Sequence, residues 1–159
     1  MKILGFDPGY EKIGYGLIKE KGHSVVYLAS GLITTHKDIK FQDRLHSIYL
    51  DACQLIKSMK PDVIVVEEIF FAINAKTAIK VAHARGVLLS AASAHHTHVV
   101  EYTPQQVKLK FAGYGRASKK EIQQAVERHL DILVKEDNTA DALAIACCHA
   151  SFSRRDMYN

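Results

Sequence analysis

Three acidic side chains stand at places in the sequence where carboxylates can meet. Asp7 ends a short apolar run that opens the chain, and Glu67 ends a second, β-branched run. Asp141 falls near the start of the last helical segment. Carboxylates at the tips of core strands are held rigidly at the edge where open α/β sheets bind ligands. If the two strands are neighbours, Asp7 and Glu67 meet at one edge of the sheet.

Three carboxylates in one place repel one another unless a cation lies among them, so this set predicts a metal site. Hard oxygen ligands favour Mg²⁺ or Mn²⁺ over zinc. Metal ions held in this way activate water and stabilise the leaving oxygen in phosphodiester cleavage, and the two-ion form needs ions about 3.5–4 Å apart. Singly, each acid has a simpler interpretation: a turn for Asp7, a solvated strand end for Glu67, and helix-dipole stabilisation for Asp141.

The elements that must position these acids follow from the hydrophobic pattern. Five strands are expected, at residues 2–6, 13–18, 24–33, 62–66 and 99–102. Five helices are expected, at residues 45–59, 74–95, 104–110, 119–130 and 139–151. The first three strands follow one another closely enough for an antiparallel meander, whereas the continuous apolar run before Glu67 is typical of a parallel strand buried on both faces. This order predicts one α/β domain with a mixed sheet and helices on both faces.

Three local patterns refine this picture. Gly14 and Gly16 leave one face of their strand nearly bare, which indicates that another segment approaches the backbone there. Ser118 and Glu121 form a capping box that predicts the start of helix 119–130. Helix 74–95 is apolar around much of its girth, which indicates either a central helix or a subunit interface.

Length and composition set the outer limits. The 159 residues suit a single domain over 1–159, with a polar tail from about residue 152 that we expect to be frayed. The formal net charge of +4 permits a polyanionic partner without proving one. The sequence has no apolar run of membrane-spanning length, and its first residues lack the pattern of a signal peptide, so we expect a cytoplasmic location and no membrane partner.

The chain resembles the RuvC family of bacterial Holliday-junction resolvases along nearly its whole length. The matching motifs, in order and spacing, are ILGFDPG (3–9), GYG (14–16), VEEIF (66–70), NA (74–75), ARG (84–86), QVK (106–108) and ADALAIA (140–146). The resemblance implies a ribonuclease-H-like fold, a five-stranded mixed sheet flanked by helices. It also implies a homodimer that cuts two opposed strands of a four-way DNA junction with Mg²⁺ or Mn²⁺, two ions per active site, and a branch-migration complex of the RuvA and RuvB type as partner.

The resemblance also assigns the site. Asp7, Glu67 and Asp141 match the acids that bind metal and catalyse cleavage in the family, with Glu67 identified by its place three residues before Phe70. Strand alternation alone does not choose between Glu67 and Glu68, because both faces of that strand are expected to be buried. We therefore expect Asp7, Glu67 and Asp141 to be the metal ligands and catalytic groups.

One position departs from the family pattern. Most members carry an acid, or sometimes His, three residues before the last Asp, and this chain has Asn138 there. Residues 138 and 141 lie one helical turn apart, so both can face the same site. Asn offers a neutral carbonyl oxygen but no charge, and it cannot act as a base. Asn138 is then a natural weaker ligand, or Asp137 takes the role, or the sequence carries an inactivating change.

The resemblance further names residues that contact DNA. Phe70 matches an aromatic that stacks on bases of the opened junction, an interaction worth about 1–3 kcal/mol per base. Lys108 and Lys119 match lysines that contact phosphates, and Arg85 is a weaker candidate. The simpler interpretations are a core position for Phe70 and a solvated face for the lysines.

Two rival functions belong to other classes. A phosphate-binding ATPase of the actin-like superfamily also begins with a strand, an Asp and a glycine turn, but it needs two such domains. A junction-binding protein with impaired catalysis is the second rival, because of Asn138. A homodimer suits a nearly two-fold junction, and we expect helix 74–95 to form its interface.

Overall fold

The computed structural model describes residues 1–69, 75–113 and 115–156, except for the side chains of residues 75, 76, 112 and 152–156. The strands of this part of the chain are β1 (Lys2–Asp7), β2 (Lys12–Lys21), β3 (Ser24–Thr34), β4 (Val63–Glu67) and β5 (His98–Tyr102). Its helices are α1 (Phe41–Met59), α2 (Ala75–Ala94), α3 (Pro104–Ala112), α4 (Lys119–Leu130) and α5 (Asp137–Asp156). None of these helices is long and apolar enough to cross a membrane.

The sheet is mixed and has the strand order β3-β2-β1-β4-β5. Strands β1, β2 and β3 pair antiparallel, which confirms the expected meander, while β4 pairs parallel with β1 and with β5. The β1–β4 register sets Phe6 opposite Val66, one residue before each strand-end acid. Asp7 and Glu67 therefore leave neighbouring parallel strands at the same edge of the sheet.

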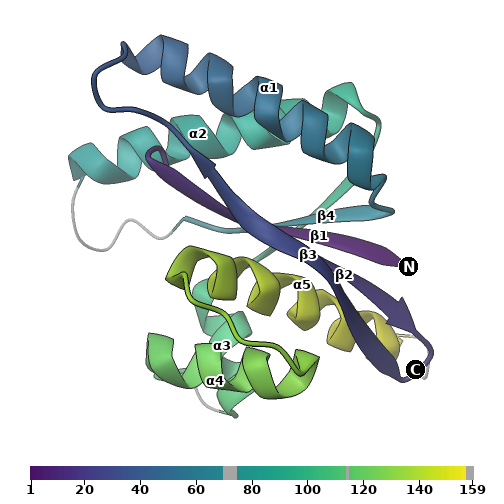
Figure 1. Ribbon diagram of the computed structural model, residues 1–159. Coiled ribbons are helices and arrows are strands. Elements are labelled where there is room, and N and C mark those ends of the chain that lie inside the picture. The colour runs from purple at the N-terminus through teal and green to yellow at the C-terminus, as the bar shows by residue number, and fades with distance from the viewer. Residues whose placement is uncertain (70–74, 114, 157–159) are drawn as a thin grey trace.

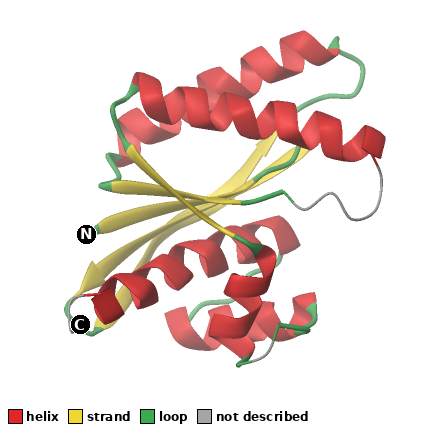
Figure 2. Ribbon diagram, turned by 180° about the vertical axis from the view of Figure 1, so that it is seen from behind, coloured by secondary structure: helices red, strands yellow, loops and turns green. Residues whose placement is uncertain are grey.

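Helices cover both faces of the sheet, as expected. Helices α1 and α2 form one layer, and α5 lies on the opposite face with α3 and α4 beyond it (Figures 1 and 2). Helix α2 lies beside α1 in this outer layer and buries Ala84, Leu88, Ala91 and Ala92, while Ile79 is exposed. Of the two interpretations of its small-residue pattern, the central helix is therefore wrong, and an interface stays a prediction.

Glycines of β1 and β2 let α5 come close to the sheet. A Cβ at Gly5 would overlap the main-chain carbonyl of Ala142, and a Cβ at Gly14 would overlap the carbonyl of Asn138. Gly16 likewise faces a side chain of α5. The segment expected to approach the bare strand face is thus α5, and its first turn is held beside the end of β1.

Helix ends agree least well with expectation. Helix α4 begins and ends as predicted, with the reciprocal Ser118–Glu121 capping box in place. In contrast, α1 begins at Phe41 and α5 spans Asp137–Asp156, so both are longer than predicted. Apolar periodicity marks the buried face of a helix but not its polar end turns. Of the tail expected to fray, residues 157–159 lie outside the described residues.

Candidate functional site

The three predicted acids share one pocket at the edge of the sheet. Its volume is about 330 Å³. It is lined by Asp7, Glu67, Pro104, Val107, Lys108, Lys119, Ile122, Asn138 and Asp141. Strands β1 and β4 and helices α3, α4 and α5 all contribute, so residues from most of the chain's length meet here. The pocket brings together six of the eight residues that the sequence singled out.

Asp7 is the most enclosed of the acids, with 9% of its surface exposed. Burial, and then the negative charge of Asp141, raise its pKa from 3.8 to about 7. The amide Nδ2 of Asn138 donates to Asp7 Oδ2 over 3.0 Å, and this bond and the charge of Lys119 act in the opposite direction. The carboxyl of Asp7 is thus desolvated and lies near negative charge, and Asn138 and Lys119 only partly offset the resulting rise in its pKa.

Glu67 is in the same situation at the end of β4. Burial, and then the charges of Asp7 and Asp141, raise its pKa from 4.5 to about 8. The charges of Lys119 and Lys108 act against this rise. Mutual repulsion among three acids is the effect that the sequence predicted for carboxylates placed together.

The structure also distinguishes between the two successive acids of the VEEIF motif. Glu67 lines the pocket, whereas Glu68 is not among its described lining residues. The backbone N–H of Glu68 instead continues the sheet by donating to the carbonyl of Tyr102 over 2.9 Å. The choice depends on which face of β4 carries α5, and an apolar run that is buried on both faces does not reveal this.

Asp141 faces a lysine across the pocket. Burial raises the pKa of Asp141, although Lys119 acts to lower it through its charge and a hydrogen bond. Lys119 Nζ lies 3.4 Å from Asp141 Oδ2, and the lysine side chain is 70% exposed. Burial is the largest single effect and acts to lower the pKa of Lys119, but the hydrogen bond to Asp141 and the charges of Asp141, Asp7 and Asp137 together outweigh it, so the pKa is raised. This lysine keeps its charge while remaining accessible to a ligand.

Asn138, and not its neighbour Asp137, occupies the fourth position of the site. Asn138 lines the pocket and contacts Asp7, while the side chain of Asp137 is exposed and is not among the described lining residues. This placement favours Asn138 over Asp137 for the role, and that choice stays a prediction.

The donor set fits a hard divalent cation. Within the described residues, no three His, Cys, Asp or Glu side chains stand in a ready-made metal-binding arrangement. Asn138 and Lys119 instead hold hydrogen bonds to Asp7 and Asp141, where a cation would otherwise satisfy the charge. Three carboxylates with raised pKa values and one amide carbonyl supply the oxygen ligands that Mg²⁺ and Mn²⁺ prefer.

A family model described as "Crossover junction endodeoxyribonuclease RuvC" matches residues 3–149. This chain belongs to the RuvC family. It is 44% identical to RuvC of Thermotoga petrophila over 156 residues, which is 97% of this chain and 94% of that one. RuvC of Alkaliphilus metalliredigens is 45% identical over 152 residues, 94% of this chain and 93% of its own.

Solved RuvC structures share the fold. The Thermus thermophilus RuvC structure matches with a TM-score of 0.89 at 32% identity, covering 98% of this chain and 97% of its own. The structure of the same protein in complex with a Holliday junction substrate matches with a TM-score of 0.92 at 32% identity, covering 98% and 96%. The ribonuclease-H-like fold, with its five-stranded mixed sheet between helices, is thereby confirmed for this RuvC family member.

Two residues to which the RuvC resemblance pointed are not among the described residues that line the pocket. Arg85 on α2 pairs with Glu101 at 2.5 Å, and its Nε donates to the main-chain carbonyl of Glu67 over 3.3 Å. It therefore braces the end of β4, and its contact with DNA stays a prediction. Phe70 lies outside the described residues, so its stacking role also stays a prediction.

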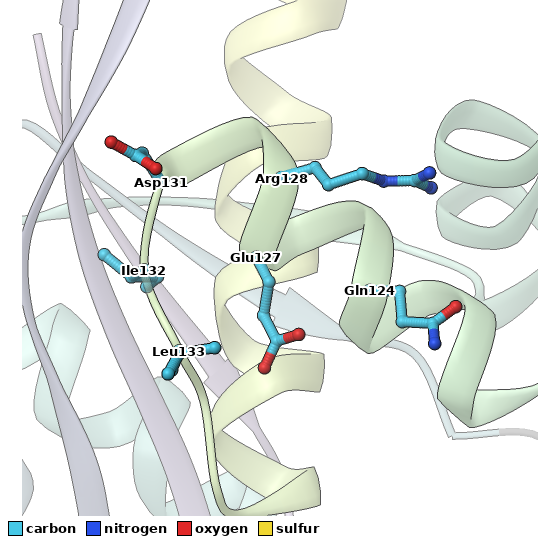
Figure 3. A pocket seen from close by; sticks show the side chains of 6 residues that line it. All are labelled: Gln124, Glu127, Arg128, Asp131, Ile132 and Leu133. Carbon is cyan, nitrogen blue, oxygen red and sulfur yellow. The ribbon is translucent and has the colours of Figure 1, made fainter.

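A larger hollow of about 530 Å³ lies at the C-terminal end of α4 (Figure 3). It is lined by Gln124, Glu127, Arg128, Asp131, Ile132 and Leu133. Glu127 is engaged there, because its Oε1 accepts a hydrogen bond from the backbone N–H of Val134 over 2.9 Å. Neither Asp7 nor Glu67 lines this hollow, so the larger of the two hollows is not the one that brings the predicted acids together.

Proposed function

We propose that this protein resolves four-way DNA junctions by hydrolysing one phosphodiester bond in each of two opposed strands. The observation that carries the proposal is a single pocket in which Asp7, Glu67 and Asp141 oppose one another's ionisation beside two lysines. Its relatives are crossover junction endodeoxyribonucleases, and the Thermus thermophilus relative is seen with a Holliday junction substrate. A protein that only binds junctions is not favoured, because the three charged groups needed for cleavage are all present.

The proposed cofactor is Mg²⁺ or Mn²⁺, with two ions in each site. Asp7, Glu67 and Asp141 would hold it, and the carbonyl of Asn138 would be a neutral fourth ligand. When bound, divalent cations supply a water molecule of lowered pKa and stabilise negative charge on the leaving oxygen. The burial of Asp7 supports this assignment, since a desolvated carboxylate gains more from a nearby cation than an exposed one.

The chain's own cations are proposed to orient the DNA. Lys108 on α3 and Lys119 on α4 both line the pocket, so a phosphate that enters it meets positive charge on the side away from the acids' strands. Each neutralised phosphate releases counterions, which makes binding depend on salt. We propose that the two lysines hold the backbone on either side of the scissile bond.

The working molecule is proposed to be a homodimer. A two-fold dimer presents two identical pockets to a nearly two-fold junction, as symmetric cleavage requires. Helix α2 supports the choice of interface, because it leaves an apolar side chain, Ile79, 52% exposed on its outer face. A branch-migration complex of the RuvA and RuvB type and a cytoplasmic location stay predictions.

A junction-cleavage assay tests the proposal. Binding is first measured in EDTA by gel shift, with a linear duplex of the same sequence as the control, and Mg²⁺ or Mn²⁺ is then added. We expect preference for the junction, followed by paired nicks in opposed strands. Binding without nicks would support the junction-binding rival, and equal affinity for the duplex would contradict both.

Asn138→Asp is expected to strengthen metal binding. A fourth carboxylate adds charge at the pocket, so we expect Mn²⁺ affinity, measured by calorimetry, and the Mn²⁺-dependent cleavage rate to rise about tenfold. In EDTA the same change removes the amide donor to Asp7 and adds repulsion, so the melting temperature should fall. Asp137→Asn is the matched control and should change neither affinity nor rate much. No gain in Mn²⁺ affinity would place Asn138 outside the ligand set.

Lys119→Ala is expected to weaken junction binding in a salt-dependent way. Loss of one phosphate contact should lower the slope of log K against log salt by about one. The matched control is Lys57→Ala, because Lys57 is exposed on α1 at the other face of the sheet. Gel shifts in EDTA at several salt concentrations measure both slopes, and an unchanged slope for Lys119→Ala would exclude this lysine from the phosphate contacts.

A further inference from the structure

Arg44 is a charged side chain buried in the layer of helices opposite α5. Only 6% of its surface is exposed. Its Nη2 donates to the main-chain carbonyl of Tyr10 over 3.0 Å, and its Nε donates to Thr35 Oγ1 over 2.9 Å. The carboxylate of Glu11 lies 3.9 Å away on a side chain that is 60% exposed, so neutral oxygens are the close partners of this cation.

A buried guanidinium held mainly by neutral acceptors is costly, because it loses its water without gaining a close ion pair. An apolar side chain at this position of α1 would pack more easily against Ile48 and Ala52, its buried neighbours on the same helix. Unlike an apolar side chain, Arg44 provides a rigid guanidinium. Two of its N–H groups donate to the carbonyl oxygen of Tyr10 and to the hydroxyl oxygen of Thr35.

Those donors converge on one residue of the loop between β1 and β2. The carbonyl of Tyr10 accepts from Arg44 and also from Thr35 Oγ1, over 2.6 Å, and the backbone N–H of Thr35 donates to the carbonyl of Glu11 over 3.0 Å. The ring of Tyr10 is held as well, with the guanidinium 5.1 Å and Lys80 Nζ 5.2 Å from its centroid. We call Tyr10, Thr35, Arg44 and Lys80 the Tyr10 cluster.

The loop held by this cluster joins Asp7, which lines the pocket, to the start of β2, which packs against α5. Asp7 ends β1 three residues before Tyr10, and it pairs across the hairpin with Gly14. Gly14 in turn packs against the main-chain carbonyl of Asn138, which leaves no room for a side chain at position 14. A shift of the loop would therefore move the carboxylate of Asp7 and the support of α5 together.

We infer that Arg44 is a positioning residue for the nuclease site: through Tyr10 and Thr35 it fixes the β1–β2 loop and so the place of Asp7 opposite Asp141. The inference rests on the proposed function. Arg44 contacts none of the reacting groups, since it lies in the α1–α2 layer and the pocket opens on the side of α3, α4 and α5.

The first test compares Arg44→Met with Arg44→Lys. Met keeps the length and loses both donors, while Lys keeps the charge but reaches one acceptor. We expect unchanged junction affinity in EDTA and a single-turnover cleavage rate that falls on the order of 10- to 100-fold in Arg44→Met. Arg44→Lys should lie between Arg44→Met and the unchanged protein.

A second pair of variants carries the test if Arg44→Met does not fold. Thr35→Val removes one hydroxyl at nearly constant shape, and Thr35→Ser keeps that hydroxyl. We expect slower cleavage in the first and a rate close to that of the unchanged protein in the second. Amide hydrogen exchange at position 35 reports directly on the order of the loop, because this N–H donates to the carbonyl of Glu11. The exchange should accelerate in Thr35→Val and not in Thr35→Ser.

General destabilisation is separated by Ile56→Val and Ile56→Ala, which alter a buried residue near the far end of α1. Whichever of them matches the melting temperature of the Arg44 variant should cleave at the normal rate. Equal rates for Arg44→Met, Thr35→Val and the matched Ile56 variant would overturn the positioning role. The proposed function fails separately, if the unchanged protein itself leaves junctions uncut.

Discussion

Asp7→Asn is expected to leave junction binding intact and to slow cleavage on the order of 10³-fold or more, because it removes a charge that would hold the metal. The substitution is nearly isosteric, so the hairpin and the contact with Asn138 can persist. Single-turnover cleavage of a four-way junction in saturating Mn²⁺ measures the rate, and a gel shift in EDTA measures binding.

The control for this experiment is Asp51→Asn, since Asp51 is exposed on α1 and far from the pocket. It should bind and cut junctions as the unchanged protein does. Cleavage by Asp7→Asn at a normal rate would contradict the assignment of Asp7. Loss of binding together with cleavage would show that Asp7 supports the DNA-binding surface, and not the chemistry alone.

Metal-free protein is expected to lose stability as the pH rises from about 4 to about 8. Burial and neighbouring charge raise the pKa of Asp7 from 3.8 to about 7 and that of Glu67 from 4.5 to about 8. Over this range the folded state keeps protons that the unfolded state has released, so the free energy of unfolding falls with pH and levels off above the folded-state pKa values. For Asp7 alone the rise corresponds to roughly 4 kcal/mol at high pH.

Urea unfolding in EDTA at several pH values measures this loss. Asp7→Asn should flatten the profile, because it removes one of the three pocket carboxyls whose pKa is raised, and it should be more stable than the unchanged protein at pH 8 without metal. Saturating Mg²⁺ or Mn²⁺ should restore stability at high pH by binding the folded state. Parallel profiles for the two proteins in EDTA would mean that Asp7 does not ionise in a negative pocket.

Much of this site follows from the sequence because its two strand-end acids belong to strongly patterned segments. The run before Glu67 is apolar at every position, which predicts a parallel strand buried on both faces, and β4 indeed lies between β1 and β5. The capping box at Ser118 likewise predicts both the existence and the start of α4. These features depend on local spacing, and local spacing is visible in one sequence.

Other features depend on contacts between distant segments. The choice of Glu67 over Glu68 needs the position of α5, and the choice of Asn138 over Asp137 needs the rotation of that helix against Gly14. Arg44 gives no signal at all, since an arginine within an amphipathic helix normally indicates a solvated position, and its acceptors are contributed by other segments. The four-way junction was predicted as the substrate only from the resemblance to the RuvC family, because the spacing of residues does not indicate which DNA structure is bound.

The hydrogen bond between Asp7 and Asn138 joins residues that are 131 positions apart in the chain. Because synthesis runs from the N-terminus, Asp7 and Glu67 leave the ribosome well before Asp141 does. Until then an emerging chain has only two of the three acids and no α5 to close the pocket. A polypeptide that stops before α5 would lack both Asp141 and Asn138, so we expect it not to cut DNA.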